Sequence, residues 1–176
     1  MTKEIFQGKI IRLVIEPEKV NKKIINFEKV YLPGAVHIFV ITDKGKVRLI
    51  KERRWVRGGK VEIKIPGGVL EKNEKPLLTA KRELKEEMGL LAKKWRLFFQ
   101  AKQTGTVNDQ RFYYLASGLR QGEAQPEEGE EILGYVDYSP KKLFNKAMAG
   151  DFNFSPTALA IIHFYDQLKK GKIKLR

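Results

Sequence analysis

The segment from Gly68 to Leu90 constrains the fold more than any other stretch of the chain. Its apolar residues recur at spacings of three and four, which predicts an amphipathic helix that packs one face into a core. These residues are Leu77, Ala80, Leu84, Met88 and Leu91. Pro76 suits the first turn of such a helix and Gly89 suits its carboxyl-terminal cap. We therefore expect a helix from about position 75 or 76 to Met88, after a loop at Pro66-Gly67-Gly68 where helix is excluded.

Three glutamates crowd one side of the same helix. Glu83, Glu86 and Glu87 stand at positions i, i+3 and i+4, so their like charges repel and give the helix no stability. A divalent cation would turn this repulsion into binding, because Mg²⁺ prefers clustered carboxylate oxygens. The segment therefore predicts a carboxylate face off the apolar stripe.

The rest of the chain reads mostly as strands. Apolar runs predict strands at 5–15, 23–32, 36–42, 46–52, 61–65, 95–102, 110–116 and 132–138. Polar turns are expected at Glu16-Pro17-Glu18 and at Asp43-Lys44-Gly45. Ser139-Pro140 and Ser155-Pro156 each supply an N-cap and a first residue for a later helix. With 176 residues, this order predicts one compact α/β sandwich with a mixed sheet and room for a small appendage.

The spacing of charged residues and glycines across Gly68–Leu90 is the most specific motif. It runs Gly68, five residues, Glu74, seven residues, Arg82-Glu83-Leu84, one residue, Glu86-Glu87, one residue, Gly89-Leu90. A solvated charged helix would explain the glutamates, but not the two glycines and the arginine at these distances. The motif resembles the complete box of the Nudix hydrolases. That resemblance implies an α/β/α sandwich and hydrolysis of a nucleoside diphosphate linked to another moiety, with Mg²⁺ or Mn²⁺ as cofactor.

The resemblance also assigns roles to the metal-binding positions. Glu83 and Glu87 are expected to be direct metal ligands, one helical turn apart. Glu86 is expected to bind a metal directly or through water and so to take part in catalysis, and the backbone carbonyl of Gly67 to complete a site. These assignments agree with the chemistry, because attack of water on a pyrophosphate needs cations to neutralise the phosphate oxygens.

Four other positions of the motif are expected to be structural. Glu74 and Arg82 should form an ion pair that holds the loop onto the helix, while Gly68 and Gly89 occupy the glycine positions of the box.

Outside the box, the chain is similar to the ADP-ribose pyrophosphatase and nucleotide-sugar pyrophosphatase branch of the family. Two strands precede Pro33-Gly34-Ala35-Val36, and an acidic loop, a strand, a short helix, a Gly-Asp step and a last helix follow late in the chain. The likeness implies that residues 1–33 form a small antiparallel β arm and residues 34–176 the Nudix domain. It also implies a homodimer that exchanges this arm, so that both protomers line each pocket.

Two residues are candidates for substrate binding. Arg54 matches the branch's phosphate-contacting arginine, and the two parallel N–H donors of a guanidinium suit phosphate oxygens. The alternative interpretation is an ordinary surface arginine that does not bind substrate. Gly105 resembles the glycine of a Ser-Pro-Gly-like loop in the branch, but residues 103–108 contain no proline. The choice between ADP-ribose, GDP-mannose and another nucleotide sugar therefore stays open.

An acidic stretch from Glu123 to Glu131 stands out in so basic a chain. In the branch that the chain resembles, the catalytic base is a glutamate in a loop before a late strand. Counting back from Ile132 places Glu128 at that position, with Glu130 as the second candidate within Glu127–Glu131. Such a glutamate could deprotonate the attacking water, and a solvated acidic turn is the alternative.

The composition of the chain limits which binding partners and which cellular locations are expected. Lysine and arginine number 35 against 21 acidic residues, and the net charge of +14 favours nucleotides, RNA or another polyanion, although surface lysines also serve solubility. The absence of cysteine excludes disulfides and thiolate metal sites. No apolar run is long enough to span a bilayer and no signal-peptide layout is present, so a cytoplasmic protein without a membrane partner is expected.

Three functional hypotheses remain at this stage. The first is a pyrophosphohydrolase of ADP-ribose or a related nucleotide sugar. The second is a Nudix hydrolase of nucleoside triphosphates, dinucleoside polyphosphates or capped RNA. The third is a non-catalytic Nudix module that binds nucleotide or RNA, although every position of the box is present.

Overall fold

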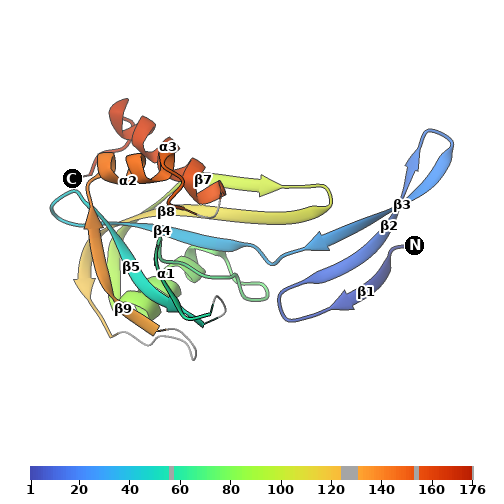
Figure 1. Ribbon diagram of the computed structural model, residues 1–176, viewed down its shortest axis with the longest axis horizontal. Coiled ribbons are helices and arrows are strands. Elements are labelled where there is room, and N and C mark those ends of the chain that lie inside the picture. Colours follow the sequence, from blue (N-terminus) through green and yellow to red (C-terminus); the bar gives the residue numbers. More distant parts are fainter. Residues whose placement is uncertain (56–57, 124–130, 153–154, 176) are drawn as a thin grey trace.

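A three-stranded arm projects from a body in which helices cover both faces of a curled sheet (Figure 1). The computed structural model describes residues 1–55, 58–123, 131–152 and 155–175. The strands of this described part are β1 Lys3–Gln7, β2 Arg12–Val20, β3 Lys23–Tyr31, β4 Ala35–Ile41, β5 Val47–Arg54, β6 Lys60–Lys64, β7 Leu90–Gln103, β8 Val107–Gln121 and β9 Glu131–Tyr138. Its helices are α1 Pro76–Met88, α2 Pro140–Met148 and α3 Ser155–Lys169.

The long strand β8 organises the sheet. It pairs antiparallel with β7 from Leu90↔Gln121 to Gln103↔Asp109, and parallel with β4 from Ala35↔Arg111 to Val40↔Ala116. Its first residues also pair parallel with the end of β3. On the other side of β4, β5 pairs antiparallel with both β6 and β9. The predicted mixed sheet is confirmed, and β7 and β8 are longer than predicted because each supplies the other with ladder hydrogen bonds along its polar ends.

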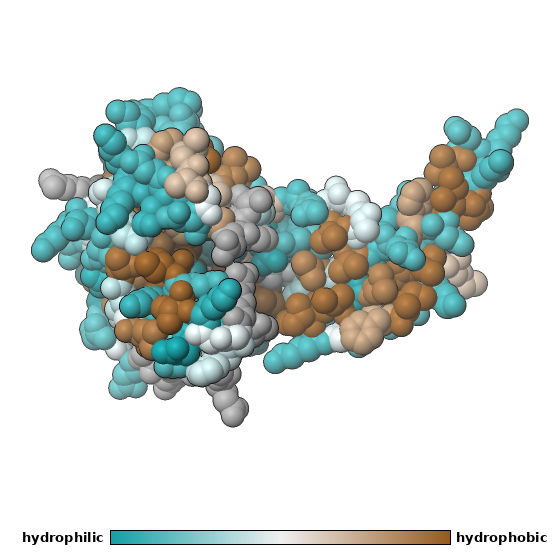
Figure 2. All heavy atoms as spheres, viewed as in Figure 1, coloured by the Kyte–Doolittle hydropathy of each residue, from teal (hydrophilic) through white to brown (hydrophobic). Residues whose placement is uncertain are grey.

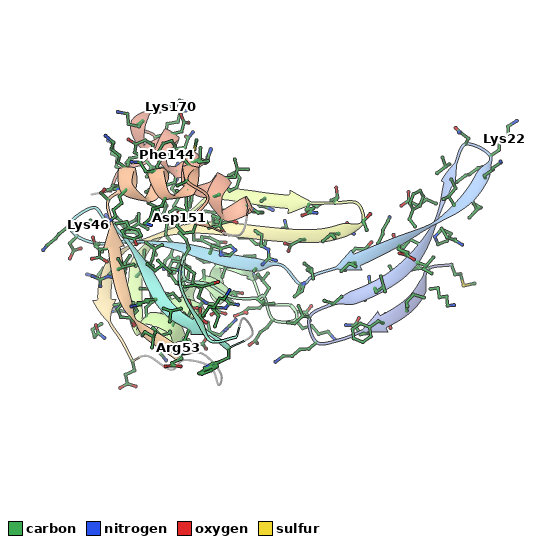
Figure 3. All side chains as sticks on the ribbon, viewed as in Figure 1. Lys22, Lys46, Arg53, Phe144, Asp151 and Lys170 are labelled. Carbon is green, nitrogen blue, oxygen red and sulfur yellow. The ribbon has the colours of Figure 1, made fainter. Side chains whose placement is uncertain are left out.

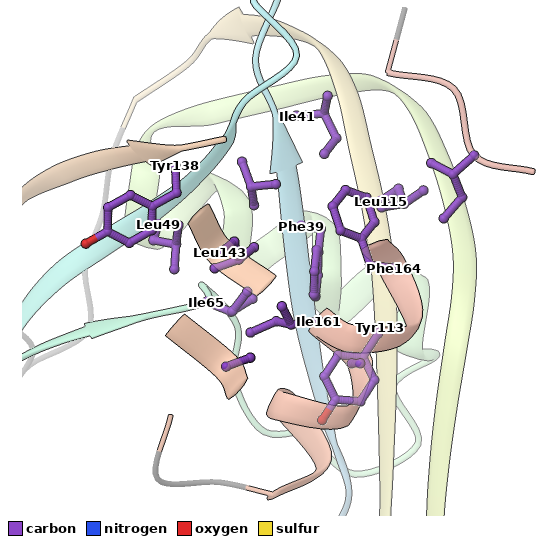
Figure 4. Close-up of a cluster of buried hydrophobic side chains, with 14 residues drawn as sticks. Phe39, Ile41, Leu49, Ile65, Tyr113, Leu115, Tyr138, Leu143, Ile161 and Phe164 are labelled. Carbon is purple, nitrogen blue, oxygen red and sulfur yellow. The ribbon is translucent and has the colours of Figure 1, made fainter. Parts of the chain in front are cut away.

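The two faces of the sheet bury separate cores because side chains alternate along each strand. Phe39 and Ile41 of β4 face α2 and α3, where Phe164 packs against Phe39 (Figure 4). Val36, Ile38 and Val40 face α1. The α1 side chains in this second core are Ala80, Leu84 and Met88. The predicted α/β/α sandwich is therefore confirmed.

Local signals set the bounds of α1. Pro76 stands at its start, and Gly89 caps its end in the left-handed conformation with φ 60°. The N–H of Gly89 donates to the carbonyl of Lys85 at 2.8 Å. The prediction that Leu91 extends the helical stripe is wrong, because the cap ends the helix and Leu91 lies in β7. Helix α2 likewise begins as predicted, with Ser139 as its N-cap.

The arm differs from its predicted layout at both of its turns. The run 5–15 is not one strand, because Gly8 donates to the carbonyl of Ile11 at 2.8 Å and closes a turn between β1 and β2. The predicted turn at 16–18 is also wrong, because β2 continues to Val20 and the chain reverses at Asn21, which has φ 57°. Lys22, beside this reversal, marks the tip of the arm farthest from the body (Figure 3).

Pro17 explains why the turn prediction failed. It pairs with Asn26 of β3, but the pairing of β1 with β2 ends at Lys3↔Ile15. Proline is tolerated in a strand where its missing N–H would take no ladder bond. Pro17 lies beyond the end of β1, on a stretch of β2 with a partner on one side only, so it interrupts nothing.

No helix of the described residues is long and apolar enough to cross a membrane.

Candidate functional site

The Pro66-Gly67-Gly68 loop follows β6 along the chain and lies against β4 and α1, and a side chain added at either of its glycines would meet a neighbouring group. Val36 donates to the carbonyl of Gly68 at 2.9 Å, and Ile38 donates to that of Pro66 at 2.8 Å, so β4 holds the loop. A Cβ at Gly67, whose φ is +144°, would lie 2.1 Å from the carbonyl oxygen of Val36. A Cβ at Gly68 would lie 2.1 Å from Oε1 of Glu83. The loop therefore brings its backbone directly against a box carboxylate.

Glu87 is held by donors from two directions. Its side chain is only 1% exposed, and its Oε2 accepts the backbone N–H of Gly67 at 2.7 Å. Its Oε1 lies 2.9 Å from the ammonium of Lys64, which also lies 2.8 Å from Oε2 of Glu52. Because buried charges are costly without partners, this Glu52–Lys64–Glu87 bridge makes the burial of all three groups tolerable.

The bridge keeps Lys64 charged. Burial lowers the pKa of Lys64, but the charges and hydrogen bonds of Glu87 and Glu52 outweigh burial and leave that pKa raised. An ammonium therefore stands between β5 and α1 at neutral pH.

Arg82 contacts the three other carboxylates of the motif. Its guanidinium lies 3.2 Å from Glu74, 3.0 Å from Glu83 and 2.8 Å from Glu86. Burial raises the pKa of Glu74, yet hydrogen bonds from Arg82 and Thr79 outweigh it and lower that pKa. The expected Glu74–Arg82 ion pair is thus present, and the same arginine also contacts two of the expected metal ligands.

The donor chemistry of this face fits a hard divalent cation. Glu83 and Glu87 are buried carboxylates on successive turns of α1, with Glu86 beside them and the Gly67 backbone at hand. Carboxylate and carbonyl oxygens are what Mg²⁺ and Mn²⁺ take as ligands. Within the described ranges no three acidic or histidine side chains stand grouped to hold a metal, and Glu87 and Glu83 are instead in contact with Lys64 and Arg82.

A basic cleft adjoins the carboxylate face. Two cavities of about 680 and 1050 Å³ meet there and share five lining residues, namely His37, Arg54, Lys64, Gly67 and Arg111. Clefts of this size suit small-molecule ligands. Three of the five side chains are cationic, so the cleft favours an anionic ligand. Arg54 lies on its wall, with its guanidinium 3.8 Å from Glu52.

His37 contributes an uncharged ring to the same cleft. Burial, together with the positive charges of Arg111 and Lys64, lowers the pKa of His37 to about 3. The ring stacks on Tyr113 with 4.8 Å between centroids. It is therefore neutral at physiological pH, and the positive charge of the cleft comes from lysine and arginine.

Comparison with known families decides the relationship that the geometry suggests. Residues 31–158 match the NUDIX domain family model. The chain belongs to the Nudix family. It is 45% identical over 92 residues to an ADP-ribose pyrophosphatase of Bacillus subtilis (strain 168), which covers 52% of this chain and 49% of that protein. It is 35% identical over 107 residues to an ADP-ribose pyrophosphatase of Mycobacterium tuberculosis, covering 58% of this chain and 51% of that one.

One further relative and one solved structure extend the comparison of this Nudix chain. A methanol dehydrogenase activator of Bacillus methanolicus is 34% identical over 125 residues, covering 69% of this chain and 66% of that protein. The alignments thus span about half to two thirds of the length of the curated relatives. A crystal structure of an ADP compounds hydrolase superposes with a TM-score of 0.79 at 20% identity, covering 97% of this chain and 93% of that one, which shows the fold.

The remaining site predictions concern Gly105 and the acidic stretch before β9 of this Nudix chain. Gly105 lies at the turn between β7 and β8, where its carbonyl accepts from Nδ2 of Asn108 at 2.9 Å, and it is not among the residues that line either cavity. Glu128 and Glu130 lie outside the described residues. Of the Glu127–Glu131 window only Glu131 is described, at the start of β9, where it lies 3.1 Å from Arg53.

Sequence reasoning missed four residues of the site, namely His37, Glu52, Lys64 and Arg111. One signal was available for Glu52, because it stands two residues after the apolar Ile50 and so falls on the same face of the strand. Lys64 stands two residues before the Pro-Gly-Gly loop, but only strand pairing turns it towards α1. For His37 and Arg111 the sequence offers no comparable signal.

Proposed function

We propose that this chain hydrolyses the pyrophosphate bond of a nucleoside diphosphate linked to another moiety, with ADP-ribose or a related nucleotide sugar as substrate. The products would be a nucleoside monophosphate and a sugar phosphate. The observation that carries this proposal is the assembly of the Nudix-box carboxylates on α1 beside a cleft lined by Arg54, Lys64 and Arg111. The two relatives named ADP-ribose pyrophosphatase support the nucleotide-sugar class.

Glu83, Glu86 and Glu87, with the carbonyl of Gly67, would hold Mg²⁺ or Mn²⁺. A bound divalent ion would neutralise charge on the phosphate oxygens and lower the pKa of the attacking water. The carboxylates of Glu83 and Glu87 are suited to this task because Gly68 and Gly67 fix where they lie before any ligand arrives.

The cleft residues would position the substrate. The guanidinium groups of Arg54 and Arg111 can donate paired hydrogen bonds to phosphate oxygens and so orient the pyrophosphate. Neutral His37 adds no charge to that cleft at physiological pH. Glu128, with Glu130 as the second candidate, would take the proton from water as it attacks one phosphorus and the bridging P–O bond breaks.

A substrate panel with Mg²⁺ tests the reaction. We expect AMP and ribose phosphate from ADP-ribose, and product analysis in ¹⁸O-labelled water identifies the phosphorus attacked. GDP-mannose, nucleoside triphosphates, dinucleoside polyphosphates and capped RNA complete the panel, because the net charge of +14 suits longer anionic substrates as well. Turnover confined to capped RNA would reject the sugar hypothesis, and micromolar binding without turnover of any substrate would indicate a non-catalytic module.

Glu87→Gln tests the metal assignment. The amide removes the negative charge and keeps the size, so turnover should fall by about a hundredfold or more. An intact Glu87→Gln protein with wild-type turnover would contradict the role of Glu87.

We also propose that a second copy of this chain covers the arm. Apolar side chains gather along the arm on the face shown in Figure 2, and Ile24 is 67% exposed and Phe6 56% exposed. Exposed apolar surface of this extent is typical of interaction sites. Gln7 and Ile10 of the same arm line the larger cavity of their own chain, so a partner that covers the arm would lie close to the substrate pocket.

Light scattering on the eluting protein tests this dimer. Wild type is expected as a dimer, and Ile24→Lys as a monomer with weakened ADP-ribose turnover. Lys22→Glu, at the tip of the same arm, is a control that should stay dimeric. A monomeric wild-type protein would contradict the proposal.

A further inference from the structure

The ammonium of Lys64 occupies a position that a metal ion would be expected to contest. It lies 2.9 Å from Oε1 of Glu87 and 2.8 Å from Oε2 of Glu52. The Glu87 and Glu52 residues are 1% and 5% exposed, so water contributes little to their neutralisation. The other oxygen of Glu87 accepts the N–H of Gly67. Both oxygens of a box carboxylate are therefore engaged by donors of the chain itself.

Strand pairing fixes Lys64 in this place. Lys64 of β6 pairs with Ile50 of β5, whose side chain lies in the core beneath α1. Glu52, two residues after Ile50, points to the same face of the sheet, and Glu87 approaches that face from α1. The ladder fixes the backbone of Lys64, so its ammonium stays tethered beside the cleft as a local positive charge.

We propose that Lys64 is a built-in cation that competes with the divalent metal for Glu87, and that its displacement adds Glu52 to the carboxylates available to the metal. A divalent ion cannot share Oε1 of Glu87 with an ammonium without like-charge repulsion in a poorly solvated site. Lys64 lines both cavities of the cleft, so the displaced ammonium has room to turn towards an anionic ligand. This inference rests on the proposed metal dependence and concerns metal affinity rather than turnover.

Binding of Mn²⁺ in the absence of substrate tests the competition. Free Mn²⁺ is measured by electron paramagnetic resonance as wild type, Lys64→Met and Lys51→Met are titrated. Lys51→Met removes the same charge from β5, but that side chain is exposed on the opposite face from Glu52. We expect Lys64→Met to bind Mn²⁺ about tenfold more tightly than wild type, and Lys51→Met to bind as wild type does. Unchanged or weaker binding by Lys64→Met would overturn the inference.

Two further variants guard against a loss of folding in Lys64→Met. Lys64→Arg keeps the positive charge and should restore wild-type Mn²⁺ affinity. A Glu52→Gln/Lys64→Met double variant leaves one fewer buried charge unpaired, and should still bind Mn²⁺ more tightly than wild type. A double variant that binds Mn²⁺ as tightly as Lys64→Met would refute the recruitment of Glu52, and the absence of any gain in both variants would refute the competition.

The outcome is separable from the proposed reaction. A wild-type protein that hydrolyses none of the panel, while Lys64→Met binds Mn²⁺ more tightly, would refute the proposed function and keep this inference. An active wild-type protein whose Mn²⁺ affinity is unchanged by Lys64→Met would do the reverse.

Discussion

One added methyl group at each of the two neighbouring glycines before α1 should affect different properties of the protein, activity at Gly68 and stability at Gly67. In Gly68→Ala the new Cβ would lie 2.1 Å from Oε1, 2.4 Å from Cδ and 2.7 Å from Oε2 of Glu83. In Gly67→Ala it would lie 2.1 Å from the carbonyl oxygen and 2.9 Å from the carbonyl carbon of Val36. The first clash is with the end of a flexible side chain, whereas the second is with the backbone of a central strand.

The geometry sets the size of each effect. To restore ordinary contact, the Glu83 carboxylate must retreat by about 1 Å, and a misplacement of that size in a catalytic group costs about a hundredfold in rate. The backbone of Gly68 suits alanine, so the free energy of unfolding of Gly68→Ala should stay within about 1 kcal/mol of wild type. Gly67→Ala combines the clash with a φ of +144°, and should lose about 3 kcal/mol or more.

Urea unfolding followed by tryptophan fluorescence, kcat/KM for ADP-ribose and Mn²⁺ affinity together separate these outcomes. Gly68→Ala should fold as wild type does, bind Mn²⁺ more weakly and turn over about a hundredfold more slowly. A Gly68→Ala protein with wild-type kcat/KM would refute the assignment of Glu83. Equal destabilisation by the two substitutions would refute the distinction between side-chain and backbone clashes.

Three further substitutions test the cleft and the fold. His37 has a pKa of about 3 in the folded protein and about 6.5 in the unfolded chain. Below pH 6.5 only the unfolded state takes up the proton. The free energy of unfolding should therefore fall by up to about 1.4 kcal/mol per pH unit. His37→Gln should flatten that dependence in urea melts at pH 6.5 and 5, and equal losses in both proteins would contradict it. Arg54→Lys should raise KM for ADP-ribose about tenfold with little change in kcat, because an ammonium cannot donate the paired hydrogen bonds of a guanidinium. A fall in kcat alone would argue against a role of Arg54 in binding the substrate phosphates in the ground state. Ser139→Ala should cost about 1 kcal/mol, because the hydroxyl accepts the N–H of Lys142 at the start of α2; an unchanged unfolding midpoint would show that this cap contributes nothing.

The sequence by itself determined the features that depend on near neighbours. Pro76 and Gly89 set the ends of α1 because the proline needs no hydrogen bond in the first turn and glycine adopts the left-handed cap without strain. The grouping of Glu83 with Glu87 follows from helical spacing, and the Glu74–Arg82 pair joins a loop to a helix only eight residues further along the same segment. The same locality misled at Pro17, where the residue's tolerance depends on how far a neighbouring strand extends.

Only the tertiary structure decided which groups of distant segments meet at the carboxylate face. Lys64 and Glu52 reach Glu87 because β5 and β6 pair in one register and α1 crosses that face of the sheet, and no spacing along the chain encodes this. Folding also placed Arg111 in the cleft and Gly105 at a turn away from its lining. The sequence thus determined the kind of chemistry through one local motif, whereas the charge balance around that motif arose from long-range strand pairing.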